Sequence, residues 1–282
     1  MDLKNYQQII NGKFVEASNL FIPSNDSGFL RGFGVFDLFI TYSGIPFHLE
    51  DHIKRLFNSA KLISLSIPYA ISEICSWVLK GLDVNKDKTE KLIRIIVTGG
   101  TLINSMTPND KDPLIIVMFG SFTRPDSALY ENGAKAFTAA VKRSFPEAKT
   151  MNYLDAVVLF QNPEHRGAAE FIYHDGCKVY EGASSNVFAL AGNQLVTSKS
   201  SILKGITRKV IIEKLGVNVV ERDLSLNELK DAKEIFITSS VREILPITVL
   251  DNRKVGTGKV GEVTGKVINE FKEYSQGDFS KK

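Results

Sequence analysis

The chain has 282 residues, of which 43% are hydrophobic and 24% are charged, a composition typical of a globular protein with one large domain or two ordinary ones. The formal net charge of +3 is too small to indicate a protein that binds nucleic acid or a membrane surface. No apolar run approaches the roughly 18–20 residues that span a bilayer. Two cysteines cannot form a disulfide framework, so we expect a soluble, cytoplasmic protein.

Signals for turns, strands and helices alternate along the chain. Two-residue turn pairs, which are strong hairpin signals, separate β-prone runs at Asn11-Gly12, Asp175-Gly176 and Gly192-Asn193. Short apolar runs predict interior strands over 92–97, 114–119, 136–141 and 234–238. Helical spacing of apolar residues predicts helices over 48–63, 70–80 and about 260–274, and one that begins near Thr207. Several strands come in hairpins, so strands and helices do not alternate strictly as in βαβ units. We therefore expect an α+β protein with mixed or antiparallel sheets.

The segment 120–133 contains Pro125, two glycines and many polar residues, and it separates two of the predicted strands. Such a composition favours a connection between domains. We therefore predict an N-terminal domain over residues 1–119, a linker over 120–130 and a C-terminal domain over 131–282.

A few residues have the chemistry to bind a metal or an anion. His48 and His52 have helical i,i+4 spacing, but the order His-Leu-Glu-Asp-His favours an ordinary helix start over a zinc site, so no metal is expected. Three features are candidates to bind an anion: the turn and helix start at 203–212, the hydroxyl-rich stretch 238–243, and Arg55. Each alone is more often a cap or a solvated charge, but together they resemble a phosphate cradle.

Six motifs follow one another over nearly the whole chain. They are RGFGVFD (31–37), HLEDHIKRL (48–56), KTMNYLDAV (149–157), HDGCKVYEGASSNVF (174–188), ILKGITR (202–208) and AKEIFITSSVREILPI (232–247). Their order and spacing resemble the class IV (fold type IV) pyridoxal-phosphate aminotransferases, which include D-amino-acid and branched-chain aminotransferases and aminodeoxychorismate lyases. The resemblance implies a two-domain fold with the active site between the domains, bound pyridoxal 5'-phosphate and a homodimer.

The resemblance also implies roles for individual residues. Lys149 aligns with the lysine that forms an aldimine with the cofactor, Glu181 with the acid that pairs with the pyridine nitrogen, and Tyr153 with the tyrosine near the phenolic oxygen. These three are the expected catalytic residues. The other expected cofactor-binding residues are Arg55, Gly205, Ile206, Thr207, Ser239 and Ser240, of which Arg55, Ile206, Thr207 and Ser240 align with the phosphate ligands.

The substrate carboxylate needs a cation. The loop 98–110 lacks the Arg-x-His pair that familiar bacterial D-amino-acid aminotransferases carry there. Arg94, which interrupts an apolar strand and must be paired there, and Arg31 are both candidates for bidentate binding of a carboxylate. Their ordinary explanations are a structural ion pair and a surface charge. Phe36 and Val241 complete the expected substrate-binding residues.

We expect transamination between an amino acid and a 2-oxo acid, with D-amino acids slightly favoured because the chain is compact and carries Arg31. A branched-chain L-amino-acid aminotransferase is the alternative, because Arg94 lies where those enzymes have a strand arginine. An aminodeoxychorismate lyase is the second alternative. A protein that binds the cofactor without catalysis is disfavoured by the intact lysine and glutamate. The loop 98–110 and the segment around Arg31 are expected at the dimer interface.

Overall fold

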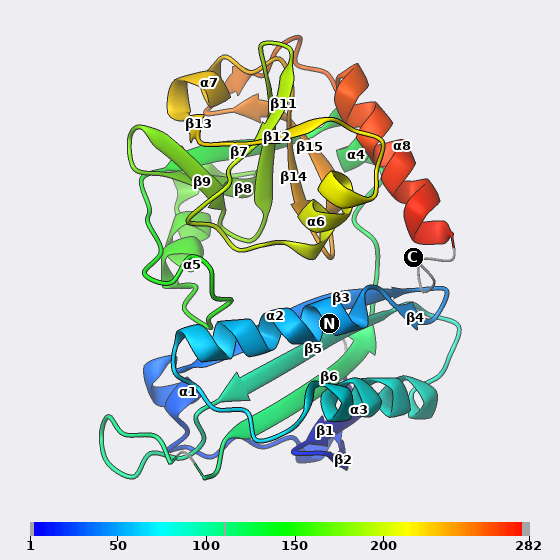
Figure 1. Cartoon of the computed structure of the whole chain (residues 1–282), viewed down its shortest axis with the longest axis vertical. Helices are drawn as coiled ribbons and strands as arrows, with labels where there is room; N and C mark the ends of the chain where they lie inside the picture. The colour runs from blue at the N-terminus through cyan, green and yellow to red at the C-terminus, as the bar shows by residue number, and fades with distance from the viewer. Residues whose placement is uncertain (1–2, 110, 278–282) are drawn as a thin grey trace. The chain divides into compact units, whose positions relative to one another are not determined.

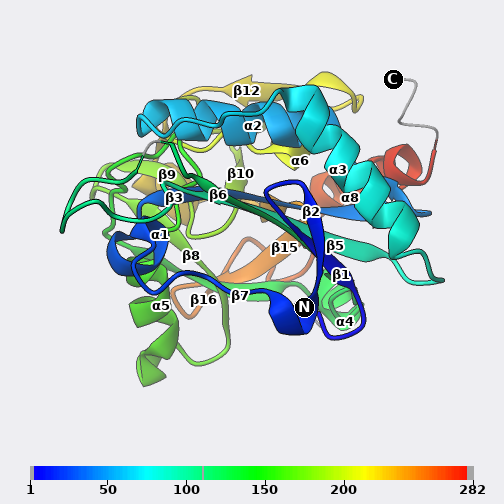
Figure 2. The ribbon, with the colours of Figure 1, turned by 90° about the horizontal axis from the view of Figure 1, so that it is seen from below.

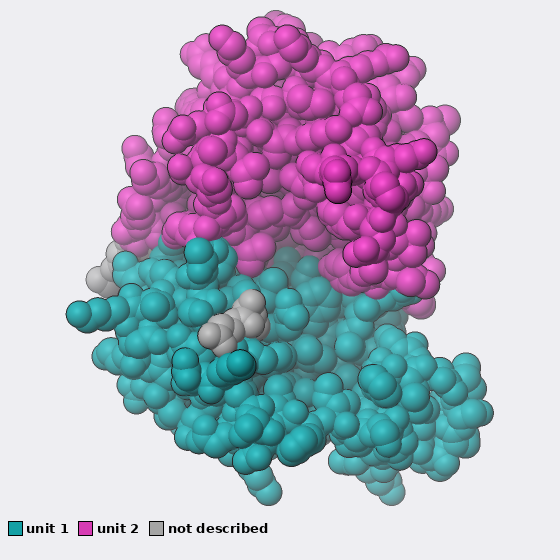
Figure 3. All heavy atoms as spheres, turned by 180° about the vertical axis from the view of Figure 1, so that it is seen from behind, with its two compact units in different colours: residues 1–123, 147–152 teal, residues 124–146, 153–282 magenta. Residues whose placement is uncertain are grey.

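The computed structural model describes residues 3–109 and 111–277, so Asp110 at the end of the loop 98–110 lies outside the described residues. The chain divides into two compact units, coloured separately in Figure 3. Residues 1–123 with 147–152 form the first unit, and residues 124–146 with 153–282 form the second. Among the helices of the described residues, none combines the length and the apolar character that crossing a membrane requires.

The first unit contains a six-stranded sheet of strand order β2-β1-β6-β5-β3-β4, in which neighbouring strands are antiparallel (Figure 1). Its elements are β1 (Gln7–Ile10), β2 (Lys13–Glu16), η1 (Ala17–Asn19), α1 (Ser27–Arg31), β3 (Gly34–Tyr42), β4 (Ile45–Pro46), α2 (Leu49–Leu62), α3 (Ile71–Val84), β5 (Lys91–Thr98) and β6 (Leu114–Ser121). The predicted hairpin at Asn11-Gly12 is confirmed, and both residues have positive φ, as a tight hairpin turn requires.

Helices α2 and α3 cover one face of this sheet, as Figure 2 shows. Alternate residues of β3, β5 and β6 point under the helices, because side chains along a strand alternate between its two faces. They are buried together with Ile53, Leu56 and Ile74, which lie on the apolar faces predicted for the helices. The helices predicted over 48–63 and 70–80 are therefore confirmed as α2 and α3.

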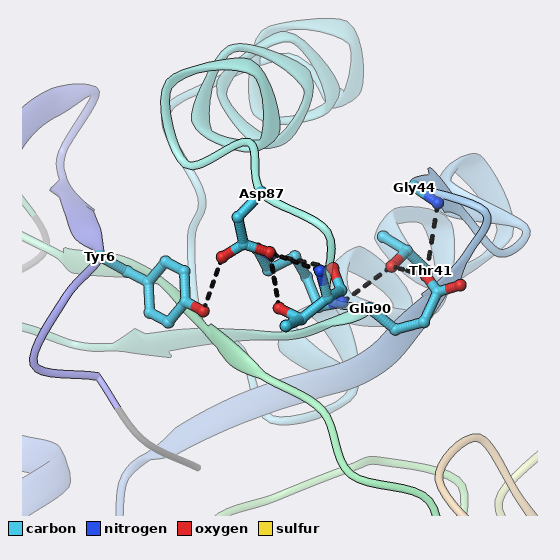
Figure 4. Close-up of polar contacts among 7 residues, drawn as sticks. Tyr6, Thr41, Gly44, Asp87 and Glu90 are labelled. Atoms are coloured by element: carbon cyan, nitrogen blue, oxygen red, sulfur yellow. Dashed lines mark hydrogen bonds and ion pairs between the residues drawn. The ribbon is translucent and has the colours of Figure 1, made fainter.

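Polar contacts anchor the end of β3 that leads into the β3–β4 hairpin (Figure 4). Glu90, in the loop before β5, accepts hydrogen bonds from Thr41 Oγ1 at 2.5 Å and from the backbone N–H of Gly44 at 3.3 Å. In the same loop, Asp87 accepts a hydrogen bond from the hydroxyl of Tyr6 at 2.9 Å. The hairpin and the loop before β5 are thereby tied together at one edge of the sheet.

The second unit contains a ten-stranded sheet of order β12-β11-β10-β14-β15-β7-β8-β9-β13, with β16 paired to β15. Its elements are α4 (Ala128–Asn132), β7 (Ala134–Ala139), α5 (Leu154–Gln161), η2 (Pro163–His165), β8 (Ala168–His174), β9 (Lys178–Gly182), β10 (Asn186–Ala191), β11 (Gln194–Thr197), α6 (Ile206–Glu213), β12 (Val219–Glu221), β13 (Leu224–Ser225), α7 (Leu226–Lys230), β14 (Ile235–Ser239), β15 (Glu243–Leu250), β16 (Arg253–Lys254) and α8 (Glu262–Gln276). Three strand pairs, β7–β8, β7–β15 and β11–β12, are parallel. The expected α+β fold with mixed and antiparallel sheets is confirmed.

Two clusters of buried apolar residues stabilise the second unit. The larger cluster joins strands β10, β14 and β15 to α7, and it includes Ile237, Leu245 and Leu229. The smaller cluster joins β7 and β8 to α5 and includes Phe137 and Phe171. The hairpins predicted at Asp175-Gly176 and Gly192-Asn193 join β8 to β9 and β10 to β11, which confirms both.

A division of the chain at residues 120–130 would place residues 147–152 in the second unit. Residues 147–152 precede α5 in the chain but group with the first unit. The physical reason is backbone pairing with β3. The N–H of Phe36 donates to the carbonyl of Lys149 at 3.0 Å, and the N–H of Met151 donates to the carbonyl of Gly34 at 3.0 Å. The six-residue segment that carries Lys149 is therefore part of the first unit.

Candidate active site

Lys149 is held against β3 and α2. In addition to the pairing with β3, its backbone N–H donates to Ser59 Oγ of α2 at 3.0 Å. Its Nζ atom lies 4.7 Å from the centroid of the Phe36 ring. The structure thus brings together two of the predicted site residues, and it fixes the backbone of the lysine from two sides.

Phe36 belongs to the sheet face that the two helices do not cover. Phe36 and Leu38 of β3 share this face, since they are two residues apart, and their partners in β5 are Ile96 and Arg94. The next residue across the sheet from Arg94 is Met118 of β6. All five side chains are half-buried, in contrast to the fully buried face beneath α2 and α3. Arg94 is the one polar side chain among these five, and the amine of the predicted catalytic lysine lies over the Phe36 ring.

A structural ion pair was the alternative role expected for Arg94. Within residues 3–109 and 111–277, Arg94 forms no such pair. Its Nε atom is buried and has no hydrogen-bond partner among the described residues. Leaving a buried donor unsatisfied is costly, and more so when the group is charged. Arg94 is therefore suited to bind an anionic group that comes from outside the chain.

Arg31 has a different environment. Its side chain is exposed at the end of α1, where its Nε donates to the carbonyl of Ser105 at 3.0 Å and its Nη1 to the carbonyl of Leu30 at 2.9 Å. These bonds tie the guanidinium to α1 and to the loop 98–110. Arg31 and Arg94, which the sequence left as equal candidates, are thus distinguished by their surroundings.

Arg55, the predicted phosphate ligand of the first unit, lies on α2 and pairs with Asp37 of β3. Its Nε is 2.9 Å from Asp37 Oδ2 and its Nη2 is 2.8 Å from Oδ1, while His52 Nδ1 is 2.7 Å from Oδ1. Asp37 and His52 are fully buried. Burial raises the pKa of Asp37, but Arg55 and His52 outweigh that effect and hold the pKa well below its usual range. Burial lowers the pKa of His52, which is therefore neutral at pH 7.

Glu181, the acid predicted to face the pyridine nitrogen, lies in β9 of the second unit and is nearly buried. Its Oε1 accepts hydrogen bonds from Arg143, from Nε at 2.9 Å and also from Nη2. Its Oε2 accepts one from the backbone N–H of Leu203 at 2.9 Å. The Nη2 of Arg143 also donates to the carbonyl of Pro146 at 2.5 Å. Both carboxylate oxygens therefore have donors that fix the orientation of the acid.

The predicted phosphate-binding turn follows Leu203 and leads into α6. Asn186 of β10 donates from Nδ2 to the carbonyl of Leu203 at 2.8 Å, and Asn186 pairs in register with Thr238 of β14. Gly205 is the N-cap of α6, and a Cβ there would lie 2.1 Å from Asn186 Oδ1, so only glycine allows this close approach. Because glycine has no capping side chain, the amides of the first turn, Ile206 and Thr207 among them, have no side-chain acceptor from the N-cap.

Hydroxyl groups gather at the end of β14. The strand ends at Ser239, and Ser240 and Val241 lie in the turn to β15. The hydroxyl of Thr238 is buried and has no hydrogen-bond partner in the described part of the chain. Together with the start of α6, which packs near β14, this end of the strand offers donors of the kind that a phosphate needs.

A buried acid holds the turn that follows Glu181. Glu170 of β8 accepts hydrogen bonds from Ser184 Oγ at 2.9 Å and from Ser185 Oγ at 2.8 Å. It also pairs with Arg242, whose Nη2 is 2.6 Å away. The two serines of the EGASSN motif are therefore structural, and Arg242 links their turn to the turn that carries Ser240. Tyr153 precedes α5 and packs against the smaller cluster, which includes Ala183 of the EGASSN turn.

Comparison with known proteins identifies the family. The model of the family described as "Amino-transferase class IV" matches residues 34–250. The chain belongs to the class IV aminotransferase family. The aminotransferase is 35% identical over 275 residues to a putative branched-chain-amino-acid aminotransferase of Methanocaldococcus jannaschii, with 94% of each chain covered. It is 32% identical over 272 residues to a D-alanine aminotransferase of Staphylococcus haemolyticus, with 94% of this chain and 96% of the relative covered.

Solved structures agree with this assignment. The branched-chain amino acid aminotransferase of Escherichia coli superposes with a TM-score of 0.86 and 26% identity, and that of Thermoproteus uzoniensis with norvaline superposes with a TM-score of 0.81 and 25% identity. Both alignments cover 98% of this chain and 96% of the other. The protein is a fold type IV aminotransferase that depends on pyridoxal phosphate. The close approach at Gly205, the buried hydroxyl of Thr238 and the buried acid Glu181 fit such a cofactor.

Several residues that hold predicted site residues in place are not among those that the sequence predicts. Asp37 interrupts an apolar strand just as Arg94 does, and a charged residue in such a strand is a signal for a buried, paired group. His52 lies in a helical i,i+4 pair with His48, and that spacing gives no sign of its contact with Asp37. Arg143 and Glu170 carry no local signal, because their partners are 38 and 14 residues away in the sequence.

Proposed function

We propose that the enzyme transfers the amino group of branched-chain L-amino acids, and that Arg94 binds the α-carboxylate of the substrate. The observation that carries this proposal is the half-buried face of β3 and β5, where the buried Nε of Arg94 lies among apolar side chains and Lys149 lies over Phe36. A guanidinium suits a carboxylate, since it can donate two parallel hydrogen bonds. Its apolar neighbours suit the side chains of leucine, isoleucine and valine.

We infer the following roles around the cofactor. Pyridoxal phosphate, when bound, supplies an aldehyde and a ring that accepts electrons. Lys149 supplies the amine that attaches to the cofactor and that moves a proton at the substrate α-carbon. Glu181 presents a fixed carboxylate to the ring nitrogen, with Tyr153 near the phenolic oxygen. The phosphate would be held by Arg55, the first-turn amides of α6 with Gly205, Ile206 and Thr207, and the hydroxyls of Ser239 and Ser240; Val241 would adjoin the substrate.

The role of Lys149 is tested by replacing it with alanine. In Lys149→Ala the visible absorbance of the covalently attached cofactor is expected to disappear, and turnover should fall by at least about 10²–10⁴-fold, the usual contribution of a positioned acid or base. Lys142→Ala, which removes an exposed lysine from the loop that leads to Lys149, is the control. Retention of the absorbance in Lys149→Ala would show that another amine carries the cofactor.

Substrate preference is tested by half-reactions of the purified holoenzyme. L-leucine, L-valine, D-alanine and D-glutamate are mixed with the enzyme in turn, and cofactor absorbance is followed. We expect rapid conversion with L-leucine and L-valine and none with D-alanine. Arg94→Gln should weaken the apparent affinity for L-leucine by about 10–100-fold, the effect of one charged hydrogen-bonding group, while Arg31→Gln should leave it unchanged. Conversion of D-alanine without L-leucine would overturn the proposal.

D-amino-acid transamination, which the sequence placed slightly ahead, is the second candidate. It is favoured by the similarity to D-alanine aminotransferases, which extends over 94% of the chain. It depended on Arg31 as the carboxylate-binding residue, however, and that guanidinium donates to two backbone carbonyls. The same half-reactions decide between the two candidates.

We also propose that two copies of the chain form a homodimer through the first unit. Large apolar side chains are exposed along the segment before β3 and along the loop 98–110; they are Phe21, Ile22, Phe29, Leu30, Ile103 and Met106. The two segments are joined by backbone bonds, from Ser27 N–H to Gly100 O at 2.8 Å and from Leu102 N–H to Asn25 O at 3.0 Å. Exposed apolar surface of this extent favours an interface between proteins.

The dimer is tested by light scattering after gel filtration. The wild type should have twice the mass of the 31.3 kDa chain, and the double variant Ile103→Asp, Met106→Asp should shift toward the monomer. Leu79→Asp, at an exposed apolar residue of α3, is the control and should remain dimeric. A monomeric wild type would refute the proposal.

A further inference from the structure

Asp37, His52 and Arg55 form a buried cluster between β3 and α2 that none of the proposed catalytic steps uses. The side chains of Asp37 and His52 are fully buried and that of Arg55 is 9% exposed. Asp37 Oδ1 accepts hydrogen bonds from His52 Nδ1, from Arg55 Nη2 and from the backbone N–H of Leu38 at 2.8 Å, while Oδ2 accepts from Arg55 Nε. The carboxylate is therefore fixed by its neighbours before any ligand binds.

The pairing fixes the plane of the guanidinium. Arg55 uses its Nε and Nη2 atoms toward the two oxygens of Asp37, which is a bidentate arrangement with one well-defined geometry. The aspartate thus fixes the orientation of the guanidinium.

The hydrogen bond to Asp37 is the feature that best explains a histidine at position 52. Its Nε2 atom is buried and has no hydrogen-bond partner among the described residues. An apolar side chain in this position would avoid the cost of that unsatisfied atom. The benefit that the histidine brings is the hydrogen bond from its Nδ1–H to Asp37, whose charge it helps to hold next to Arg55.

We propose that Asp37 and His52 are positioning residues for the cofactor phosphate, which they orient through Arg55. This inference rests on the proposed role of Arg55 as a phosphate ligand. A guanidinium held in one plane by a buried carboxylate loses less conformational freedom when phosphate binds than a mobile one does. The strength of phosphate binding is then set by two residues that do not contact the cofactor.

The test compares two ligands that differ only in the phosphate. Apoenzyme is titrated with pyridoxal phosphate and with pyridoxal, and both dissociation constants are measured from absorbance. Asp37→Asn should weaken binding of pyridoxal phosphate by about 10–100-fold, the effect of losing a charged hydrogen bond, and binding of pyridoxal by less than about threefold. In an Arg55→Gln background, Asp37→Asn should have no further effect on either ligand.

His52 variants keep the test decisive if Asp37→Asn fails to fold, which thermal melting would show. His52→Leu should selectively weaken binding of pyridoxal phosphate, and His52→Asn, whose amide N–H can take the place of Nδ1–H, should restore it. His48→Gln is the matched control, because His48 lies on the same segment and pairs with a different acid, Asp51, at 3.3 Å. It should change neither constant.

Each other outcome has a definite meaning. Equal weakening for both ligands, or unchanged binding of pyridoxal phosphate in folded Asp37→Asn, would overturn the positioning role. If Arg55→Gln alone leaves binding of pyridoxal phosphate unchanged, the proposed role of Arg55 fails instead, and that result is distinguishable because it does not involve Asp37 or His52.

Discussion

The two units, each taken by itself, carry different kinds of proposed cofactor ligands. The first unit offers charged side chains, and Arg55 is kept in place by a buried counter-charge on Asp37. The second unit offers mostly backbone amides and hydroxyls around Gly205 and the end of β14, and its acid Glu181 is fixed by one arginine and one amide. A side chain whose charge is buried depends on its partner, whereas a backbone cradle depends on close packing. Substitutions that remove a charge should therefore disturb the ligand of the first unit, and substitutions that add side-chain volume should disturb the backbone ligands of the second.

Glu181 is the exception in the second unit, and its replacement should give the largest effect. In Glu181→Gln the neutral amide no longer matches a positive ring nitrogen, so turnover should fall by about 10²–10⁴-fold while the cofactor remains bound. Arg143→Gln leaves the carboxylate with the Leu203 amide and should reduce turnover less. Steady-state rates with a matched amino donor and 2-oxo acid, together with cofactor content, measure both effects. Normal turnover of Glu181→Gln would contradict its role.

Replacement of Gly205 tests whether the turn before α6 requires a residue without a side chain. In Gly205→Ala the new Cβ would meet Asn186 Oδ1 at 2.1 Å, so either Asn186 or the turn must move. We expect a loss of about 1–3 kcal/mol in the free energy of unfolding, as for other overpacked sites, and weaker retention of the cofactor. Gly265→Ala in α8, where the new Cβ would meet no atom outside its own stretch of helix within 4 Å, is the control and should be neutral or slightly stabilising. Equal stability of the two variants would refute close packing at the cradle.

The smallest expected effect is a dependence of stability on pH. It comes from the buried charged groups of the first unit. The folded pKa of His52 lies below its unfolded value of 6.5, so the unfolded chain binds the proton more readily. Its contribution is complete above about pH 6.5 and is lost as the pH falls. Asp37, whose folded pKa lies below 3.8, adds a further loss in stronger acid.

Denaturant unfolding at pH 7 and pH 5 measures this effect. The free energy of unfolding of the wild type should be lower at pH 5 than at pH 7, because the unfolded chain takes up a proton that the folded His52 does not. His52→Asn should show a smaller decrease, and His48→Gln should behave as the wild type. A decrease in His52→Asn as large as that of the wild type would assign the acid sensitivity to other groups.

Local patterns predicted much of the fold. The three hairpins, the interior strands and the helices α2, α3, α6 and α8 follow from turn pairs and apolar periodicity, which are properties of neighbouring residues. The order of the motifs predicted the family and the cofactor. The same patterns left Arg31 and Arg94 equal, because both are single cations in the sequence and only their neighbours in space differ.

The sequence by itself determined much of the secondary structure, the family and the candidates for the reactive lysine and acid. Only the tertiary structure decided that residues 147–152 join the first unit, that Asp37 and His52 hold Arg55, and that Arg143 holds Glu181. These contacts depend on strand register and on how loops return to a sheet. No local periodicity encodes such a pairing, because its partners are brought together by the packing of the whole unit.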